Sequence, residues 1–119
     1  MPRFALLRHE SPRGLHWDLL LEVGPALRTW ALPQPPQVGV ELSCQALPDH
    51  RLAYLQYEGP LSEERGSVIR WDEGTYEAES EDETQWVVRL EGRWLVGPAT
   101  LRRVPEGPDQ WRFLLTGAT

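Results

Sequence analysis

The stretch that decides the fold is HWDLLLEVGPALRTWAL, residues 16–32. Apolar and polar side chains alternate over His16–Val23, so one face of an extended strand would carry Trp17, Leu19, Leu21 and Val23. The opposite face would carry His16, Asp18, Leu20 and Glu22. Gly24-Pro25 is a turn signal, and Ala26–Leu32 resumes as a strand. The stretch predicts a β-hairpin whose first strand turns its Trp-Leu-Leu-Val face to a core.

Short apolar segments separated by turn residues continue on both sides of this hairpin. Further strands or extended segments are expected at Arg3–Arg8, Leu52–Glu58, Gly66–Trp71, Thr75–Glu79, Gln85–Leu90, Arg93–Leu101 and Gln110–Leu115. Asp72-Glu73-Gly74 and Glu91-Gly92 are typical hairpin turns, and a loop is expected from Pro33 to about Pro48. Strands at this spacing predict an all-β protein, a small compact β-barrel of about seven to nine mostly antiparallel strands. Trp30 and Trp71 are expected to be largely buried.

Length and composition limit the protein class. The chain has 119 residues, which fits one domain over residues 1–119. No apolar run approaches the roughly 20 residues of a membrane-spanning helix, and the N-terminal residues lack a signal-peptide pattern. The single cysteine, Cys44, excludes an internal disulfide and a multi-cysteine zinc site. We therefore expect a cytoplasmic protein without a membrane partner.

The charged residues are unevenly distributed. All 12 basic residues are arginines; a planar guanidinium suits phosphate, but the same bias is typical of a GC-rich genome. The net charge of −6 argues against a protein that coats nucleic acid. Acidic residues crowd the segment from Asp72 to Glu83 without a basic residue among them, a pattern typical of a solvated turn. A phosphate site is therefore expected in the first half of the chain.

Three residues near the N-terminus could bind a metal ion. His16 and Asp18 point to the same face of a strand. His9 reaches that face if the connection Ser11-Pro12-Arg13-Gly14 folds back. Two imidazoles and a carboxylate suit Zn²⁺, Mn²⁺ or Fe²⁺. The same spacing is also typical of unrelated surface or core histidines, and periodicity does not separate the two interpretations.

A second polar group lies at Asp49–Gly59. It gathers His50, Arg51 and Tyr54, whose donors suit a phosphate or general acid–base chemistry. An ordinary turn followed by a strand with edge tyrosines has the same composition.

Five segments in order resemble one known family. The matching segments are His9–Glu22, Leu27–Pro33, Asp49–Gly59, Gly66–Glu77 and Leu90–Trp94. Over nearly the whole chain they are similar to the 3′-phosphoesterase domain of bacterial ligase D, which also occurs as small free-standing proteins. The resemblance implies a compact β-barrel. It also implies a metal-dependent hydrolase, usually with Mn²⁺, that removes a 3′-phosphate or a 3′-terminal ribonucleotide from DNA during repair.

The resemblance also implies site residues. The metal ligands fall on His9, His16 and Asp18, with Mn²⁺ expected and Zn²⁺ or Co²⁺ as alternatives. The substrate-phosphate contacts, which would include a catalytic group, fall on His50 and Tyr54. The expected partners are DNA or RNA-tipped DNA 3′ ends, and a DNA ligase or polymerase in trans.

The chain departs from the family pattern at the phosphate site. Ligase-linked members have an arginine two residues after the metal aspartate, where this chain has Leu20. Arg13, in the turn between two metal ligands, is the first candidate for a substitute phosphate-binding and catalytic arginine, and Arg51 is the second. The loop before Gly66 is shortened to Ser62-Glu63-Glu64-Arg65. Two functions therefore remain: the enzyme, and a non-catalytic metal- or DNA-end-binding accessory module of the same fold.

Overall fold

The computed structural model describes residues 1–117, which form nine β-strands and one short 3₁₀ helix. In chain order these are β1 (Arg3–Ser11), β2 (Gly14–Val23), β3 (Ala26–Leu32), β4 (Leu42–Arg51), η1 (Leu52–Leu55), β5 (Gly59–Pro60), β6 (Ser67–Glu81), β7 (Gln85–Gly92), β8 (Val96–Arg103) and β9 (Gln110–Leu115). The predicted all-β class is confirmed. Within residues 1–117, no helical segment has the length and hydropathy needed to cross a membrane.

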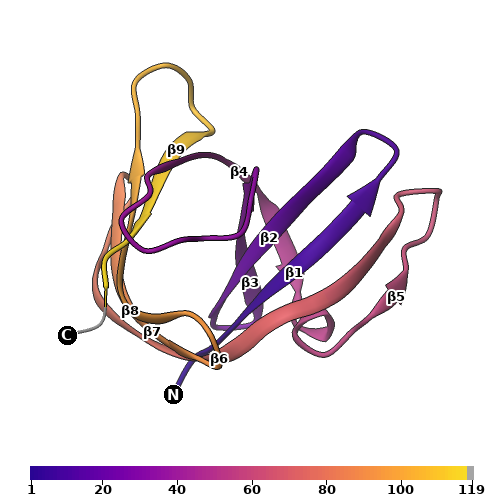
Figure 1. Ribbon diagram of the computed structural model, residues 1–119, viewed down its shortest axis with the longest axis horizontal. Coiled ribbons are helices and arrows are strands. Elements are labelled where there is room, and N and C mark those ends of the chain that lie inside the picture. The colour runs from indigo at the N-terminus through magenta and orange to yellow at the C-terminus, as the bar shows by residue number, and fades with distance from the viewer. Residues whose placement is uncertain (118–119) are drawn as a thin grey trace.

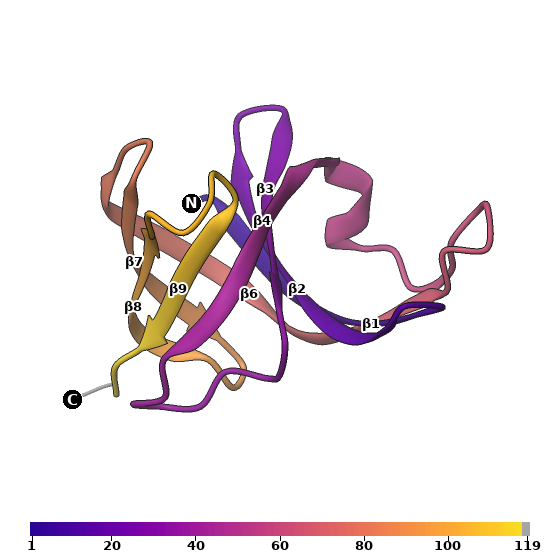
Figure 2. The same cartoon turned by 90° about the horizontal axis from the view of Figure 1, so that it is seen from above.

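Eight strands close into an antiparallel barrel, as predicted. Neighbours pair in the order β1-β2-β3-β4-β9-β8-β7-β6, and β6 returns to pair with β1. Closure satisfies the backbone hydrogen bonds of strands that would otherwise be exposed edges. The two residues of β5 pair with the start of β6. Figures 1 and 2 show β1, β2 and β6 running on past the barrel wall, so that these three strands project together as an arm.

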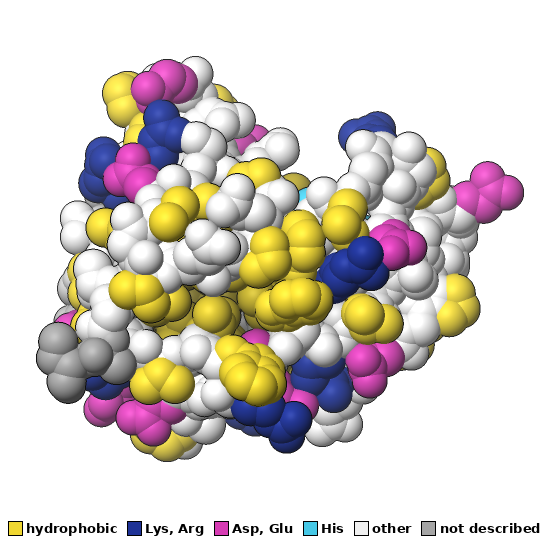
Figure 3. Space-filling model, in the orientation of Figure 1, with side chains coloured by type: hydrophobic (Ala, Val, Ile, Leu, Met, Phe, Trp, Pro, Cys, Tyr) yellow, Lys and Arg dark blue, Asp and Glu magenta, His cyan; other side chains and the backbone are white. Residues whose placement is uncertain are grey.

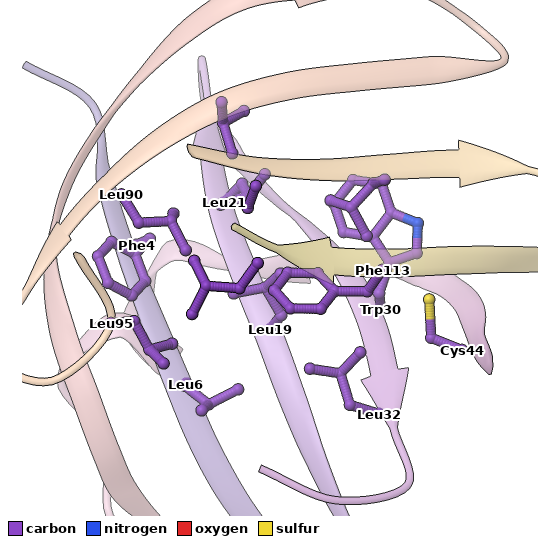
Figure 4. Packing of buried hydrophobic residues seen from close by; sticks show 14 of the residues in the cluster. Phe4, Leu6, Leu19, Leu21, Trp30, Leu32, Cys44, Leu90, Leu95 and Phe113 are labelled. Atoms are coloured by element: carbon purple, nitrogen blue, oxygen red, sulfur yellow. The ribbon is translucent and has the colours of Figure 1, made fainter. Parts of the chain in front are cut away.

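The barrel interior is filled by the predicted apolar face of β2 and its counterparts on the other strands. Leu19 and Leu21 are fully buried and Trp17 is nearly so, which confirms the prediction for these residues. Trp30 is also fully buried, as predicted, and Figure 4 shows it among the side chains that fill the interior. The prediction is wrong at Val23, which is exposed because it borders the hairpin turn.

The other face of β2 is buried as well. Leu20 is 0% exposed and belongs to a second apolar cluster on the outside of the barrel. We call this the outer cluster; its buried members are Ala5, Leu7, Leu20, Leu27, Leu55 and Val68, with Tyr54 and Leu61 packed against them. Because η1 contributes Leu55, the connection from β4 to β5 covers this face. Asp18 therefore lies on a strand whose inner face packs in the barrel core and whose outer face packs in the outer cluster.

The predicted burial of Trp71 is wrong: the residue is 43% exposed. Trp71 is the extra residue of a β-bulge, since the β6 residues on either side of it pair with Leu6 and Leu7 of β1. A bulged residue does not follow the in–out alternation of its strand. The Trp17 ring packs edge-on against it, with centroids 5.9 Å apart. Figure 3 shows exposed hydrophobic side chains gathered over the middle of one face of the molecule.

The segment before η1 also differs from the prediction. The sequence predicts a loop to about Pro48, but β4 runs over Leu42–Arg51. Pro48 is tolerated because it lies with Asp49 at a bulge opposite Arg28, where the β3–β4 ladder is interrupted. Leu52–Leu55 forms the 3₁₀ helix η1, and the strand predicted there is wrong.

The predicted hairpin turn at Asp72-Glu73-Gly74 is wrong, because β6 is continuous from Ser67 to Glu81. It pairs with β1 on one side and with β7 on the other. Gly74 serves a close approach of two strands, since a Cβ there would lie 2.0 Å from the carbonyl oxygen of Glu91.

Asp72, the first member of the acidic run, is buried and fixes the β7–β8 turn. One carboxylate oxygen accepts hydrogen bonds from the backbone N–H groups of Glu73 and Arg93, both at 2.8 Å. The other accepts from those of Trp94 at 3.0 Å and Leu95 at 2.7 Å. The prediction of a solvated acidic turn is therefore wrong for this residue.

Replacing Asp72 with asparagine should destabilise the fold, because one acceptor oxygen becomes an amide that faces two backbone donors. We expect the free energy of unfolding of Asp72→Asn to fall by about 2–6 kcal/mol, since each of the two buried donors left unpaired costs about 1–3 kcal/mol. Urea denaturation followed by tryptophan fluorescence measures the change. Glu77→Gln, an exposed carboxylate on the same strand, should stay within about 0.5 kcal/mol of wild type. Equal unfolding midpoints for Asp72→Asn and wild type would contradict this role.

Candidate metal and phosphate site

Two histidines and an aspartate meet where β1 and β2 enter the arm. His9 lies directly opposite His16 in the antiparallel register, and their ring centroids are 4.5 Å apart. Asp18 shares the face of His16 on β2. One ligand atom from each of the three residues lies within 4.8 Å of the others. The structure therefore brings together all three predicted metal ligands, which we call the triad.

His9 is held by a partner at each ring nitrogen. Nε2 lies 2.9 Å from the carbonyl oxygen of Arg65, which can only accept, so Nε2 donates its proton there. In the neutral ring Nδ1 then carries a lone pair, and it faces Asp18 Oδ2 at 3.1 Å. Two acceptors at this distance need a cation between them, either a proton or a metal ion. A backbone carbonyl that fixes the tautomer in this way is a usual partner of metal-binding histidines.

Asp18 is the buried member of the triad, with a side chain only 4% exposed. Its Oδ1 lies 3.0 Å from His16 Nε2, but no hydrogen bond of suitable geometry reaches this oxygen from the described residues. Burial raises the pKa of Asp18, but the neighbouring imidazoles of His16 and His9 outweigh it and keep the pKa below its usual value. The hydrogen bond to Asp18 in turn raises the pKa of His9, against the effect of burial. A buried, unbonded carboxylate oxygen beside two imidazoles fits a divalent cation.

A cavity of about 410 Å³ adjoins the triad and contains the predicted phosphate-binding residues. His9 and Asp18 line it together with His50, Arg51 and Tyr54. The last three come from the end of β4 and from η1, and the His50 and Tyr54 rings meet edge-on with centroids 5.6 Å apart. The volume lies in the usual range of small-molecule sites, so the cavity has room for more than a metal ion.

His50 is oriented by a buried threonine that the sequence analysis missed. The Thr29 hydroxyl donates to the carbonyl of Leu27 at 3.0 Å, and it therefore accepts from His50 Nδ1 at 3.1 Å. The Pro48 carbonyl also accepts from Nδ1, at 3.0 Å. Both partners require the proton on Nδ1. The other nitrogen, Nε2, is left for a ligand or for proton exchange.

The structure places the candidate phosphate-binding arginines differently from the expectation, which put Arg13 first and Arg51 second. Arg13 is exposed in the β1–β2 turn and is not among the residues that line the cavity. Arg51 and Arg65 both line it. Sequence reasoning missed Arg65, because its loop has no periodicity that indicates which side chain faces the site.

Comparison with known proteins identifies the family. The profile described as "DNA Ligase D 3'-phosphoesterase domain" matches residues 7–103. The chain belongs to this family. The match includes every residue of the triad and of the cavity lining, so the resemblance stated from the sequence is confirmed.

Curated relatives are much longer proteins. The Mycobacterium tuberculosis multifunctional non-homologous end joining DNA repair protein LigD is 31% identical over 117 residues, which cover 91% of this chain and 15% of the relative. The Pseudomonas aeruginosa multifunctional non-homologous end joining protein LigD is 33% identical over 79 residues, 62% of this chain and 9% of the relative. The chain therefore spans a small part of the relatives that it matches.

Metal binding by the triad is directly measurable. We expect the protein to bind about one equivalent of Mn²⁺, Zn²⁺ or Co²⁺ in calorimetric titration, since the triad offers one set of ligands. Asp18→Asn should weaken the affinity at least about tenfold, because the amide removes the negative charge of the carboxylate that faces both imidazoles. His50→Ala removes a histidine of the same cavity outside the triad and should bind the metal as wild type does. Unchanged affinity in Asp18→Asn would exclude the triad as the binding site.

Proposed function

We propose that this protein is a metal-dependent phosphoesterase that processes DNA 3′ ends, removing a 3′-phosphate or a 3′-terminal ribonucleotide. The supporting observation is that the triad adjoins a cavity lined by His50, Arg51 and Tyr54. A cation site beside groups that donate to phosphate is the arrangement that phosphoester hydrolysis needs. Membership of the DNA ligase D 3′-phosphoesterase family supports the same activity.

The triad residues would hold the metal ion. His9 would use Nδ1, which the Arg65 carbonyl leaves unprotonated in the neutral ring. His16 and Asp18 would complete the set from β2. When bound, a divalent cation, Mn²⁺ by the resemblance, polarises phosphoryl oxygens and lowers the pKa of water.

The remaining residues of the cavity would act on the phosphate. His50, fixed through Nδ1 by Thr29 and Pro48, would use Nε2 to bind a phosphate oxygen or to protonate the leaving oxygen. The Tyr54 hydroxyl would donate to a second phosphate oxygen. Packing of the Tyr54 ring against His50 and the outer cluster would hold the hydroxyl in position. Arg51 adds positive charge to the same cavity.

The charge of the protein suits action at an end. A net charge of −6 disfavours long contacts with the DNA backbone. Contact with terminal nucleotides alone requires few cationic groups. The relatives are named as multifunctional end-joining proteins, so we propose that this domain acts in DNA repair together with a DNA ligase or polymerase.

The test is turnover of defined 3′ ends. Primer–template duplexes carrying a 3′-phosphate or one terminal ribonucleotide should be converted to 3′-OH ends with Mn²⁺ and not after chelation. His50→Ala should lower turnover about 10²- to 10⁴-fold, the usual contribution of a general acid or base. Arg89→Ala, an exposed arginine on β7, serves as the control and should match wild type. A protein that binds metal but converts neither end would support the accessory-module function and contradict the enzyme.

A further inference from the structure

Besides a metal ion, a phosphate site uses cationic side chains, and β2 supplies none to the cavity. Leu20, two residues after Asp18 on the same face, is fully buried in the outer cluster. Its side chain packs with those of Leu7, Leu27 and Val68 and has no polar group. A cationic side chain at the cavity must therefore come from its other walls, which contain Arg51 and Arg65.

The guanidinium of Arg65 is held in place by a neutral neighbour. Its Nε donates to the Ser62 carbonyl and its terminal nitrogen Nη2 to the Ser62 hydroxyl, both at 3.0 Å. Within residues 1–117 no carboxylate forms an ion pair with it, in contrast to Arg70, which pairs with Glu73 at 3.4 Å. A guanidinium that is ordered but not neutralised keeps its charge for an anion and loses little side-chain entropy on binding one.

The loop that carries Arg65 is fixed against β1. The Leu61 N–H donates to the Gly66 carbonyl at 2.7 Å, which closes the loop. Gly66 has φ +92°, and a Cβ there would lie 1.7 Å from the carbonyl oxygen of Glu10, so only glycine fits against the strand. Glu63 and Glu64 also have left-handed backbone, with φ of 60° and 56°. The close contact between Gly66 and Glu10 therefore fixes the position of the preceding residue, Arg65.

Arg65 lies beside the triad as well as in the cavity. Its carbonyl accepts the hydrogen bond from His9 Nε2. Arg65 thus contacts a metal ligand through its backbone carbonyl and is also among the residues that line the cavity.

We propose that Arg65 is the phosphate-binding arginine of this site and that Ser62 is the residue that positions it. The ligand class is a phosphate monoester or the terminal phosphodiester of a 3′ end. The inference rests on the proposed function for its substrate, but it concerns binding and is tested without turnover. Arg51, which lines the same cavity, has no comparable hydrogen bond among the described residues to fix its guanidinium.

The experiment measures binding of inorganic phosphate and of thymidine 3′-monophosphate by calorimetry, on metal-free and on Mn²⁺-loaded protein. Arg65→Ala should weaken both ligands at least about tenfold in both forms, while Mn²⁺ affinity stays within about twofold because the backbone carbonyl remains. Arg65→Lys should recover part of the loss, since it restores charge without the planar fork. Ser62→Ala should give a smaller loss than Arg65→Ala. Arg89→Ala, with its exposed guanidinium on β7, is the matched control.

The outcomes separate this inference from the proposed function. If wild type binds phosphate but converts no 3′ end, the enzyme is contradicted, and the Arg65→Ala affinities still decide the role of Arg65. Phosphate affinity unchanged in Arg65→Ala, or lost in Arg13→Ala instead, would overturn the assignment, as would a wild type without phosphate affinity. Equal urea midpoints for Arg65→Ala and wild type exclude loss of folding as the cause.

Discussion

The register of the β1–β2 hairpin governs both the barrel core and the site. Ser11 pairs with Gly14, and this places His9 opposite His16 two pairs further on. The turn is set locally: the Ser11 hydroxyl donates to the Gly14 carbonyl at 3.0 Å and accepts from the Arg13 N–H at 3.2 Å. Gly14 has φ +124°, a backbone conformation that other residues rarely adopt. A slip of one residue would turn the apolar face of β2 out of the barrel and separate the two histidines. Folding of the core therefore selects the geometry of the triad.

Two buried carboxylates show how burial can serve structure or chemistry. Asp72 and Asp18 are both 3% exposed. Each oxygen of Asp72 accepts two backbone hydrogen bonds, so the charge is satisfied and the β7–β8 turn is fixed. Asp18 faces only two imidazoles, and its Oδ1 lacks a hydrogen bond among the described residues. An unsatisfied buried charge is costly to a fold, and a bound cation would remove that cost. The contrast favours a ligand-binding role for Asp18 and a structural role for Asp72.

The sequence predicts those parts of the structure in which local pattern and tertiary environment agree. The bounds of β3 and β9 match the prediction because alternation and turn residues coincide there. The same reasoning places His16 and Asp18 on one face of β2, whereas His9 joins them through the register of the β1–β2 hairpin. It does not predict β4, where Pro48 sits at a bulge, or β6, where Gly74 serves a strand contact and not a turn. Both exceptions depend on the partner strand, which local sequence does not contain. The sequence does not predict Arg65 for a similar reason: the position of its loop depends on the close approach of Gly66 to β1.

The triad lies on β1 and β2, whereas the other polar residues of the cavity come from the end of β4, from η1 and from the loop before β6. The burial of β2 explains why β2 contributes no cationic residue. The outward face of β2 passes from Asp18 at the cavity to Leu20 beneath η1. An arginine at residue 20 would have to be accommodated where Leu55 and Tyr54 now pack, at the cost of desolvating a charge. Arg65 avoids that cost because it is exposed and its hydrogen-bond partner is a serine of its own loop. With leucine at residue 20, every buried member of the outer cluster is apolar. Tyr54 packs against this apolar cluster and also lines the cavity. The packing that disfavours an arginine at residue 20 therefore also orders the Tyr54 side chain.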